Sequence, residues 1–415
     1  MNDLSPKGFN GAREAHEADG MGSSPAKRGR GTTRSVVKGA TTDSEAICGA
    51  ATHGAAPSVS ASRCHLPRKR GRNPSPHTLR SIADLGNAEL VSRDRVSQLE
   101  AVAARYAIAI TPAMAELIDG DATGPIARQF VPDTAELVTL PEERDDPIGD
   151  HVHEATEGLI HRYPDRVLLK FTGVCAVYCR FCFRREMVGQ EGAGVLSDTA
   201  LDAALAYIRS HTEIWEVIVS GGDPLIVSPR RLERLMTALG AIAHVKVIRF
   251  HTRVPVVAPE RITEALVGAL KASGKTVWVA IHANHAREFT EAARAATARL
   301  ADAGIPLVSQ TVLLRGVNDD AETLGALMRV FVENRVKPYY LHHGDLAPGT
   351  SHFRTGFAAG QDLMRALRGD YSGLCQPTYV LDIPGGHGKV PVGPTYLRCT
   401  AGEVDDPHGG THSLR

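Results

Sequence analysis

The stretch Cys175-Ala-Val-Tyr-Cys179-Arg-Phe-Cys182 follows directly on an apolar strand pattern over residues 167–172, and it guides the interpretation of the whole chain. It is a CxxxCxxC run with no fourth cysteine close by. A cubane iron–sulfur cluster needs one ligand per iron, so three thiolates from one short loop leave one iron open for a substrate or cofactor. We therefore predict that Cys175, Cys179 and Cys182 bind a [4Fe-4S] cluster that takes part in chemistry.

A zinc loop is the alternative interpretation of the same cysteines. Structural zinc sites close with four ligands, and the chain has no second CxxC pair that would complete such a site. Together with the basic clusters near the N-terminus, this alternative describes a zinc-dependent nucleic-acid-binding protein. It predicts a protein without acid-labile sulfide that binds RNA in a salt-sensitive way.

The composition excludes several classes of protein. The chain has 415 residues, with 47 Lys and Arg against 47 Asp and Glu, which argues against a nucleic-acid or membrane-binding surface over the whole protein. No apolar run approaches the roughly 18 residues that span a bilayer. Seven cysteines are too few and too unevenly placed for a disulfide framework. Since a low-potential cluster needs a reducing compartment, we expect a cytoplasmic protein.

Sequence patterns divide the chain into four parts. Residues 1–77 are rich in Gly, Ala, Ser and basic residues without an apolar period, which is typical of a disordered basic tail. Residues 78–150 have helical apolar spacing, with Leu99, Val102, Ala103 and Tyr106 on one face, and predict a small helical preface. Residues 151–400 form the main domain, and residues 401–415 are expected to be a flexible tail.

In the main domain, short apolar strand patterns alternate with helical patterns. The expected strands are 167–172, 216–220, 245–251, 276–281, 307–313 and 338–342. The expected helices are 198–210, 229–239, 260–272, 287–303 and 320–334. This alternation indicates an α/β fold with a parallel sheet and helices outside it, and six such units make an incomplete (β/α)6 barrel. Ligands gather at the carboxyl ends of the strands in such barrels, where the cysteine loop also lies.

Two glycine-rich segments carry residues suited to ligand binding. Ser220-Gly221-Gly222-Asp223-Pro224 follows an expected strand, although alone it is a common tight turn. Pro384-Gly385-Gly386-His387-Gly388-Lys389 ends in a lysine whose ammonium could reach a carbonyl from this loop. The alternative for that lysine is an exposed position in a surface turn.

Together these motifs resemble, in their order, those of lysine 2,3-aminomutases in the radical S-adenosylmethionine (SAM) superfamily. The other segments that carry the resemblance are His161-Arg162-Tyr163-Pro164-Asp165-Arg166, Arg184 and the sequence LLRGVND at 313–319. The resemblance covers residues 78–398 and implies the same partial barrel. It also implies that SAM chelates the open iron, and that the reduced cluster cleaves SAM to a deoxyadenosyl radical.

The resemblance further implies roles for single residues around two cofactors. Lys389 matches the lysine that forms the resting Schiff base with pyridoxal 5′-phosphate (PLP). The residues that match the family's SAM-binding segment are Ser220, Gly221, Gly222 and Asp223. The residues that match its motif near PLP, with cationic and hydroxyl groups for the phosphate, are Arg162, Tyr163 and Arg166.

Three charged residues match the substrate-binding positions of the family. Arg184 matches the arginine that binds the carboxylate of the amino acid. Asp345 and Asp382 match the two aspartates that hold the ammonium of the lysine side chain. Two carboxylates close together repel one another unless a cation lies between them, so this pair favours a cationic substrate over glutamate.

The resemblance implies an isomerase that moves the α-amino group of L-lysine to C3 and yields β-lysine. The alternatives are the same chemistry on another amino acid, or β-lysine supply for elongation factor P modification, a branch that the pair His342-His343 resembles. We expect a small amino acid as the substrate, a flavodoxin-type or ferredoxin-type reductant, and neither a membrane nor a nucleic acid as a partner. A homo-oligomer stays open, because the tail after Cys399 lacks the cysteines of the family's zinc segment.

Overall fold

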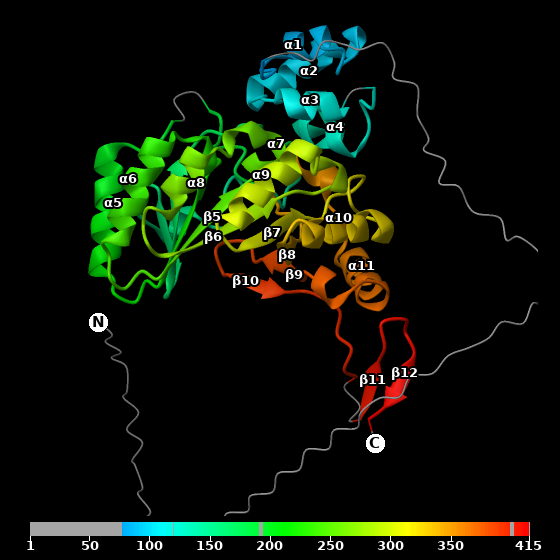
Figure 1. Cartoon of the computed structure of the whole chain (residues 1–415). Helices are drawn as coiled ribbons and strands as arrows, with labels where there is room; N and C mark the ends of the chain where they lie inside the picture. The colour runs from blue at the N-terminus through cyan, green and yellow to red at the C-terminus, as the bar shows by residue number, and fades with distance from the viewer. Residues whose placement is uncertain (1–76, 119, 191–193, 399–401, 415) are drawn as a thin grey trace, which may run out of the picture. The chain divides into compact units, whose positions relative to one another are not determined.

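The computed structural model describes residues 77–118, 120–190, 194–398 and 402–414 (Figure 1). The predicted basic tail therefore lies outside the described residues, apart from residue 77. All described residues belong to one compact unit, Arg70–Arg415. None of the helices in this described part is long and apolar enough to cross a membrane.

Short helices form the predicted preface. They are α1 (Ile82–Asn87), α2 (Arg93–Arg105), α3 (Pro112–Ile118) and α4 (Pro125–Phe130). Ser81 begins α1 with a capping box, because its side chain accepts from the Asp84 backbone while the Asp84 side chain accepts from the Ser81 backbone. Leu99, Val102 and Tyr106 are buried, as the helical spacing predicts. The preface continues through the 3₁₀ helices η1 (Thr134–Leu137) and η2 (His151–His153).

A single ten-stranded sheet forms the main domain, in the strand order β1 to β10. Its strands are β1 (Glu154–Thr156), β2 (Leu159–Tyr163), β3 (Arg166–Thr172), β4 (Glu216–Gly221), β5 (Val247–Thr252), β6 (Thr276–His282), β7 (Leu307–Val312), β8 (Val336–His342), β9 (Thr378–Asp382) and β10 (Lys389–Pro391). Strands β3 to β9 are parallel, while β1, β2 and β10 pair antiparallel at the two ends. The parallel part is thus the predicted partial barrel with a seventh strand, β9, added to the expected six.

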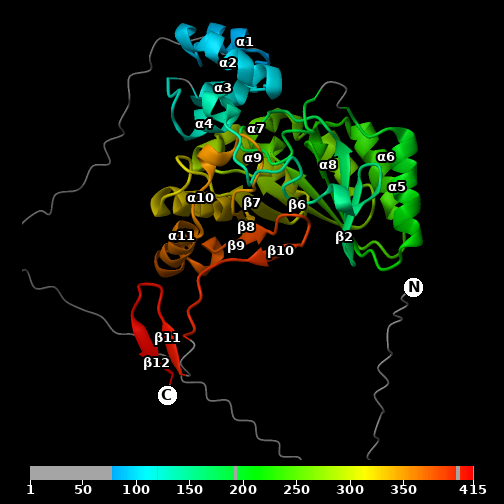
Figure 2. The same cartoon turned by 180° about the vertical axis from the view of Figure 1, so that it is seen from behind.

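Helices cover the outer face of this sheet (Figures 1 and 2). They are α5 (Asp198–Ser210), α6 (Pro229–Gly240), α7 (Val254–Val257), α8 (Glu264–Lys271), α9 (Glu291–Asp302), α10 (Ala321–Glu333) and α11 (Phe357–Asp370). The 3₁₀ helices of this domain are η3 (Pro224–Ile226), η4 (Pro259–Arg261), η5 (Ala286–Glu288), η6 (Ser351–Phe353) and η7 (Gly373–Cys375). Each long helix buries an apolar face; in α5 that face includes Leu201, Leu205 and Ile208. Strand β4 is buried over 216–220, as expected for a parallel strand covered on both faces.

The C-terminal residues differ from expectation. Strands β11 (Glu403–Asp405) and β12 (Thr411–Ser413) pair antiparallel in a hairpin. The hairpin gives regular structure to a stretch that we expected to be a flexible tail. Its turn is stabilised by Asp406, whose side chain accepts from the backbone of His408 and of Gly410.

Candidate active site

One cavity of about 610 Å³ brings the predicted site residues together. Its lining includes every residue to which the sequence analysis assigns a role: Arg162, Tyr163, Arg166, Cys175, Cys179, Cys182, Arg184, Ser220, Gly221, Gly222, Asp223, Asp345, Asp382 and Lys389. These residues come from strands and loops far apart in the sequence. The cysteine loop, the SGGDP segment, Asp345 and Asp382 lie at the carboxyl ends of parallel strands, which meet at one edge of the sheet. Tyr163 and Arg166 lie at the other edge, where β2 turns into β3.

The three cysteines lie in the loop between β3 and α5, and all are free thiols. Burial raises the pKa of each thiol, that of Cys182 to about 11. Across the described residues, no three His, Cys, Asp or Glu side chains are placed to hold a single metal ion. A cubane cluster does not need such convergence, because each thiolate binds a different iron.

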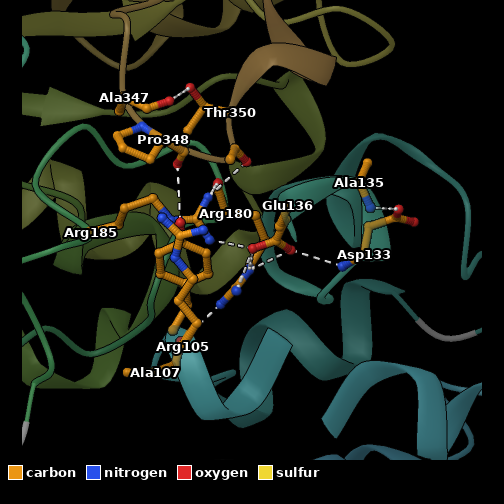
Figure 3. Close-up of polar contacts among 12 residues, drawn as sticks. Arg105, Ala107, Asp133, Ala135, Glu136, Arg180, Arg185, Ala347, Pro348 and Thr350 are labelled. Atoms are coloured by element: carbon orange, nitrogen blue, oxygen red, sulfur yellow. Dashed lines mark hydrogen bonds and ion pairs between the residues drawn. The ribbon is translucent and has the colours of Figure 1, made fainter. Parts of the chain in front are cut away.

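A buried ion cluster fixes the cysteine loop to the preface (Figure 3). The Arg180 Nε lies 3.0 Å from both carboxylate oxygens of Glu136, and Arg185 pairs with the same carboxylate. The Arg185 guanidinium also lies over the ring of Tyr106, 3.5 Å from its centroid. Burial opposes the charge of Glu136, but Arg180 and Arg185 outweigh it and lower the pKa of this carboxyl. Because Arg180 lies between two of the cysteines, this cluster orients the loop itself.

We expect Glu136→Gln to lower the free energy of unfolding by roughly 3–5 kcal/mol, because the amide leaves two buried guanidinium groups without a counter-charge. In the wild type, the ionised Glu136 should contribute its full stabilisation above the ordinary pKa of a glutamate. This contribution to the free energy of unfolding should be lost as the pH falls through the lowered pKa of Glu136 in the folded state. Urea unfolding at neutral and acidic pH measures both effects. Glu333→Gln, at an exposed ion pair with Arg294, is the matched control and should change stability by less than about 0.5 kcal/mol. Equal effects of the two substitutions would contradict the prediction.

The SGGDP segment packs directly on the beginning of the cysteine loop. Gly221 has a positive φ of 112°, and a Cβ at Gly222 would lie 2.2 Å from the carbonyl oxygen of Val174. Only glycine allows this approach, so strand β4 ends against the residue that precedes Cys175. The carboxylate of Asp223 accepts from the Thr252 hydroxyl at 2.7 Å and from the Arg253 backbone at 2.7 Å, and burial raises its pKa. In the structure this carboxylate therefore ties β4 to β5.

Lys389 begins β10 and lies opposite Asp382 on β9 in the antiparallel register. The Lys389 Nζ forms an ion pair with Asp382 and lies 3.3 Å from the Nδ1 of His342. Its backbone nitrogen donates to the hydroxyl of Tyr163 at 2.8 Å. The alternative of an exposed lysine in a surface turn is thus excluded: Lys389 lines the cavity, and β2, β8 and β9 supply its partners.

The pKa values of the two aspartates expected to bind an ammonium are shifted in opposite directions. Burial alone would raise the pKa of Asp382, but His342 and Lys389 outweigh it and lower that pKa far below the ordinary value. Asp345 accepts no hydrogen bond from the described residues, and burial together with the nearby charge of Asp382 raises its pKa to about 7. Asp345 therefore has no ion-pair partner among the described residues, although the charge of Lys389 lowers its pKa slightly from a longer distance.

Asp150 has no predicted role, but its carboxylate binds two of the arginines that are predicted to contact substrate or cofactor. Arg184 donates to Asp150 from Nε at 3.1 Å and from Nη2 at 2.9 Å, and Arg162 reaches the other carboxylate oxygen at 3.2 Å. Burial opposes the charge of Asp150, yet the arginines lower its pKa. Arg166 instead pairs with its neighbour Asp165 and lies 3.8 Å from the ring centroid of Tyr163.

Sequence reasoning also missed residues that reach the cavity from β5 and its carboxyl end. His251 lines the cavity, and its Nε2 is buried without a hydrogen-bond partner among the described residues. Burial, with Arg249 and Arg184 nearby, lowers its pKa well below the ordinary value, so the ring is neutral. Arg253 lies against the cluster loop. The apolar alternation of β5 predicts that the strand is buried. It gives no signal that His251 lines the cavity or that Arg253 contacts the cysteine loop.

Comparisons with known proteins agree with this geometry. The Radical SAM superfamily profile matches residues 169–327, so the partial barrel and its cysteine loop define a radical SAM protein. The Lysine-2,3-aminomutase profile matches residues 364–410. An L-lysine 2,3-aminomutase of Acetoanaerobium sticklandii is 46% identical over 292 residues, and one of Clostridium subterminale is 44% identical over 291 residues, with 70% of each chain covered in both cases. A glutamate 2,3-aminomutase of Clostridioides difficile is 37% identical over 300 residues, covering 72% of this chain and 70% of that protein. The chain belongs to the lysine 2,3-aminomutase family.

Membership of this family implies a [4Fe-4S] cluster and SAM. The residues present fit both groups, because three free thiols and residues 220–223 of the SGGDP segment line the same cavity. Three thiolates would leave one iron of the cluster without a protein ligand, and SAM could bind that iron.

Proposed function

We propose that this protein is an L-lysine 2,3-aminomutase that moves the α-amino group to C3 and releases β-lysine. The observation that carries the proposal is the distribution of charge in the cavity, with Arg184 for a carboxylate and Asp345 and Asp382 for a side-chain ammonium. Asp345 has a raised pKa and no ion-pair partner among the described residues, which is the state expected of a carboxylate that waits for a cation. A glutamate side chain would place a third carboxylate beside these two.

We further propose that PLP is bound covalently through Lys389, with Arg162, Tyr163 and Arg166 at its phosphate. When bound, PLP supplies a carbonyl carbon for the amino group and a conjugated system that stabilises an unpaired electron. Lys389 is held toward the cavity by Tyr163 at its backbone and by Asp382 at its ammonium. Asp382 would hold the free Lys389 amine and would be available for the substrate ammonium when Lys389 is bonded to PLP.

The remaining residues position the substrate and exclude water. One carboxylate oxygen of Asp150 accepts from both Nε and Nη2 of Arg184, so the guanidinium proposed to bind the substrate carboxylate is oriented before substrate arrives. His342 hydrogen-bonds Lys389, and burial together with Lys389 lowers the pKa of this imidazole. It is therefore a neutral ring whose Nδ1 can accept a hydrogen bond from the Lys389 ammonium and help to hold it. We propose a flavodoxin-type or ferredoxin-type reductant for the cluster, and a cytoplasmic location because the cluster needs reducing surroundings.

An anaerobic assay tests this function. Reconstituted protein is incubated with PLP, SAM and reductant, and separately with L-lysine, L-glutamate and L-alanine, and the products are resolved by chiral mass spectrometry. We expect β-lysine from lysine and no product from the other two. Deoxyadenosine without β-lysine would keep the radical chemistry but refute lysine as the free substrate, and β-glutamate would overturn the charge argument.

The pKa of Asp345 predicts a pH dependence of lysine binding. An ammonium is bound best by the ionised carboxylate, so the affinity for lysine should fall as the pH drops below about 7 and level off above about pH 8. Calorimetric titration in buffers of different ionisation enthalpy should also show proton release on binding near pH 7. Asp345→Asn should flatten this step in the pH profile, and a wild-type profile without a step near pH 7 would contradict the prediction.

A further inference from the structure

Arg253 contacts the cysteine loop between β3 and α5. It follows β5, and its Nη1 donates to the Sγ of Cys179 at 2.9 Å. Its Nη2 pairs with the Oε2 of Glu288 at 2.7 Å, in a place where both side chains are buried. Rings of Phe130 and Phe181 lie within 4.7 and 5.5 Å of the guanidinium carbon. The guanidinium is thus buried and packed against two aromatic rings.

The same residue also contacts the segment that follows β4. The backbone nitrogen of Arg253 donates to Asp223 at 2.7 Å, while the side chain reaches Cys179. One residue therefore links a cluster thiolate to the SGGDP turn. The guanidinium of an arginine is charged throughout the pH range in which proteins fold, so Arg253 brings a fixed positive charge to Cys179.

A cation that donates a hydrogen bond to a thiolate ligand stabilises the extra negative charge of a reduced cluster. Inside the protein this effect is screened less than it would be in water. The carboxylate of Glu288 has the opposite effect, because it binds Nη2 of the same guanidinium and neutralises part of its charge. The two residues therefore act on the cluster with opposite signs.

We propose that Arg253 is a positioning residue that holds Cys179 and raises the reduction potential of the [4Fe-4S] cluster, and that Glu288 limits this increase. The proposal rests on the cluster that the family implies. It does not depend on the substrate, because the contacts involve neither Asp345 nor Lys389.

The test is a redox titration of the full-length, reconstituted protein, followed by the EPR signal of the reduced cluster, without PLP or amino acid. We expect Arg253→Gln to weaken electron uptake at least tenfold, which is a shift of about 59 mV to more negative potential for a one-electron couple. Glu288→Gln should shift the potential in the positive direction. Arg253→Lys should stay closer to the wild type than Arg253→Gln, since it keeps the charge.

Controls separate tuning of the potential from general damage. Arg287→Gln, at an exposed ion pair with Asp121, should leave the potential unchanged. If Arg253→Gln does not load iron, the double variant Arg253→Gln/Glu288→Gln leaves no buried charge unpaired and should show a more negative potential than Glu288→Gln alone. Shifts of the same sign in Arg253→Gln and Glu288→Gln, unchanged potentials, or folded variants that never load iron would each overturn the proposal. Failure of the lysine assay with these shifts intact would refute only the proposed substrate.

Discussion

Lys389→Ala should abolish PLP loading while leaving the cluster intact. The substitution removes the only amine proposed to bond covalently to the cofactor, and orientation of reacting groups accounts for several orders of magnitude in rate, so we expect kcat/KM to fall roughly 10³-fold or more. Absorbance of the Schiff base, iron content and the EPR signal of the reduced cluster are measured on the same preparation. The first should vanish and the other two should match the wild type.

The matched control for this experiment is Lys337→Ala. Lys337 lies on β8, the strand that also carries His342, but it is exposed and donates to the backbone oxygens of Leu374 and Gln376. Its loss should leave PLP loading and activity unchanged. Unchanged PLP loading in Lys389→Ala would remove Lys389 from its proposed role, whereas loss of iron in that variant would indicate general damage to the cavity.

Asp345→Asn should weaken lysine binding and at the same time stabilise the substrate-free fold. Loss of one partner of a buried charge pair costs about 2–5 kcal/mol, so we expect the affinity for lysine to fall roughly 30-fold or more. The affinity for SAM should change less than about twofold, because the charge contact is made by the amino acid substrate. 2-Aminohexanoate, which lacks the side-chain ammonium, should bind the variant and the wild type with similar affinity.

The expected stabilisation by Asp345→Asn follows from the raised pKa of Asp345. The folded-state pKa of Asp345, about 7, lies above the ordinary value of 3.8, so ionisation of this carboxyl costs the fold free energy as the pH rises between those values. The cost is complete above about pH 7, and the neutral amide removes it. We therefore expect a higher Tm for Asp345→Asn at pH 8 and little difference near pH 4. A lower Tm at both pH values would assign Asp345 a structural role instead.

Local patterns predicted most of the barrel because they are properties of short segments. The strands 167–172, 216–220, 276–281 and 307–313 agree with β3, β4, β6 and β7 to within one residue at each end. Two helices begin later than predicted. Thr263 caps α8 by accepting from the Leu266 backbone, and Thr290 caps α9 by accepting from the Ala293 backbone. Each threonine has an extended backbone, so the α-helix cannot continue toward the N-terminus through it. The residues before these caps form the separate 3₁₀ helices η4 and η5.

Strand β9 and the buried ion pairs between carboxylates and arginines could not be predicted from local sequence patterns. The apolar run in β9 covers only Tyr379, Val380 and Leu381, too short to be told from a loop, and the strand exists because it pairs with the exposed edge of β8. Asp150 and Glu136 look like ordinary solvated acids in the sequence. Only the fold buries them among arginines that are distant along the chain.

The sequence by itself determined the spacing of the three cysteines predicted to bind the cluster, the βα order and the positions that could face a common site, because ligand spacing and apolar periodicity are properties of the chain itself. The tertiary structure alone decided the partners of each charge. Lys389 meets Asp382 and His342, Arg184 meets Asp150, and Arg253 meets Cys179, because strand ends of one sheet converge at its edge. Coulomb and desolvation energies depend on distance and burial in three dimensions, and neither quantity is contained in sequence spacing.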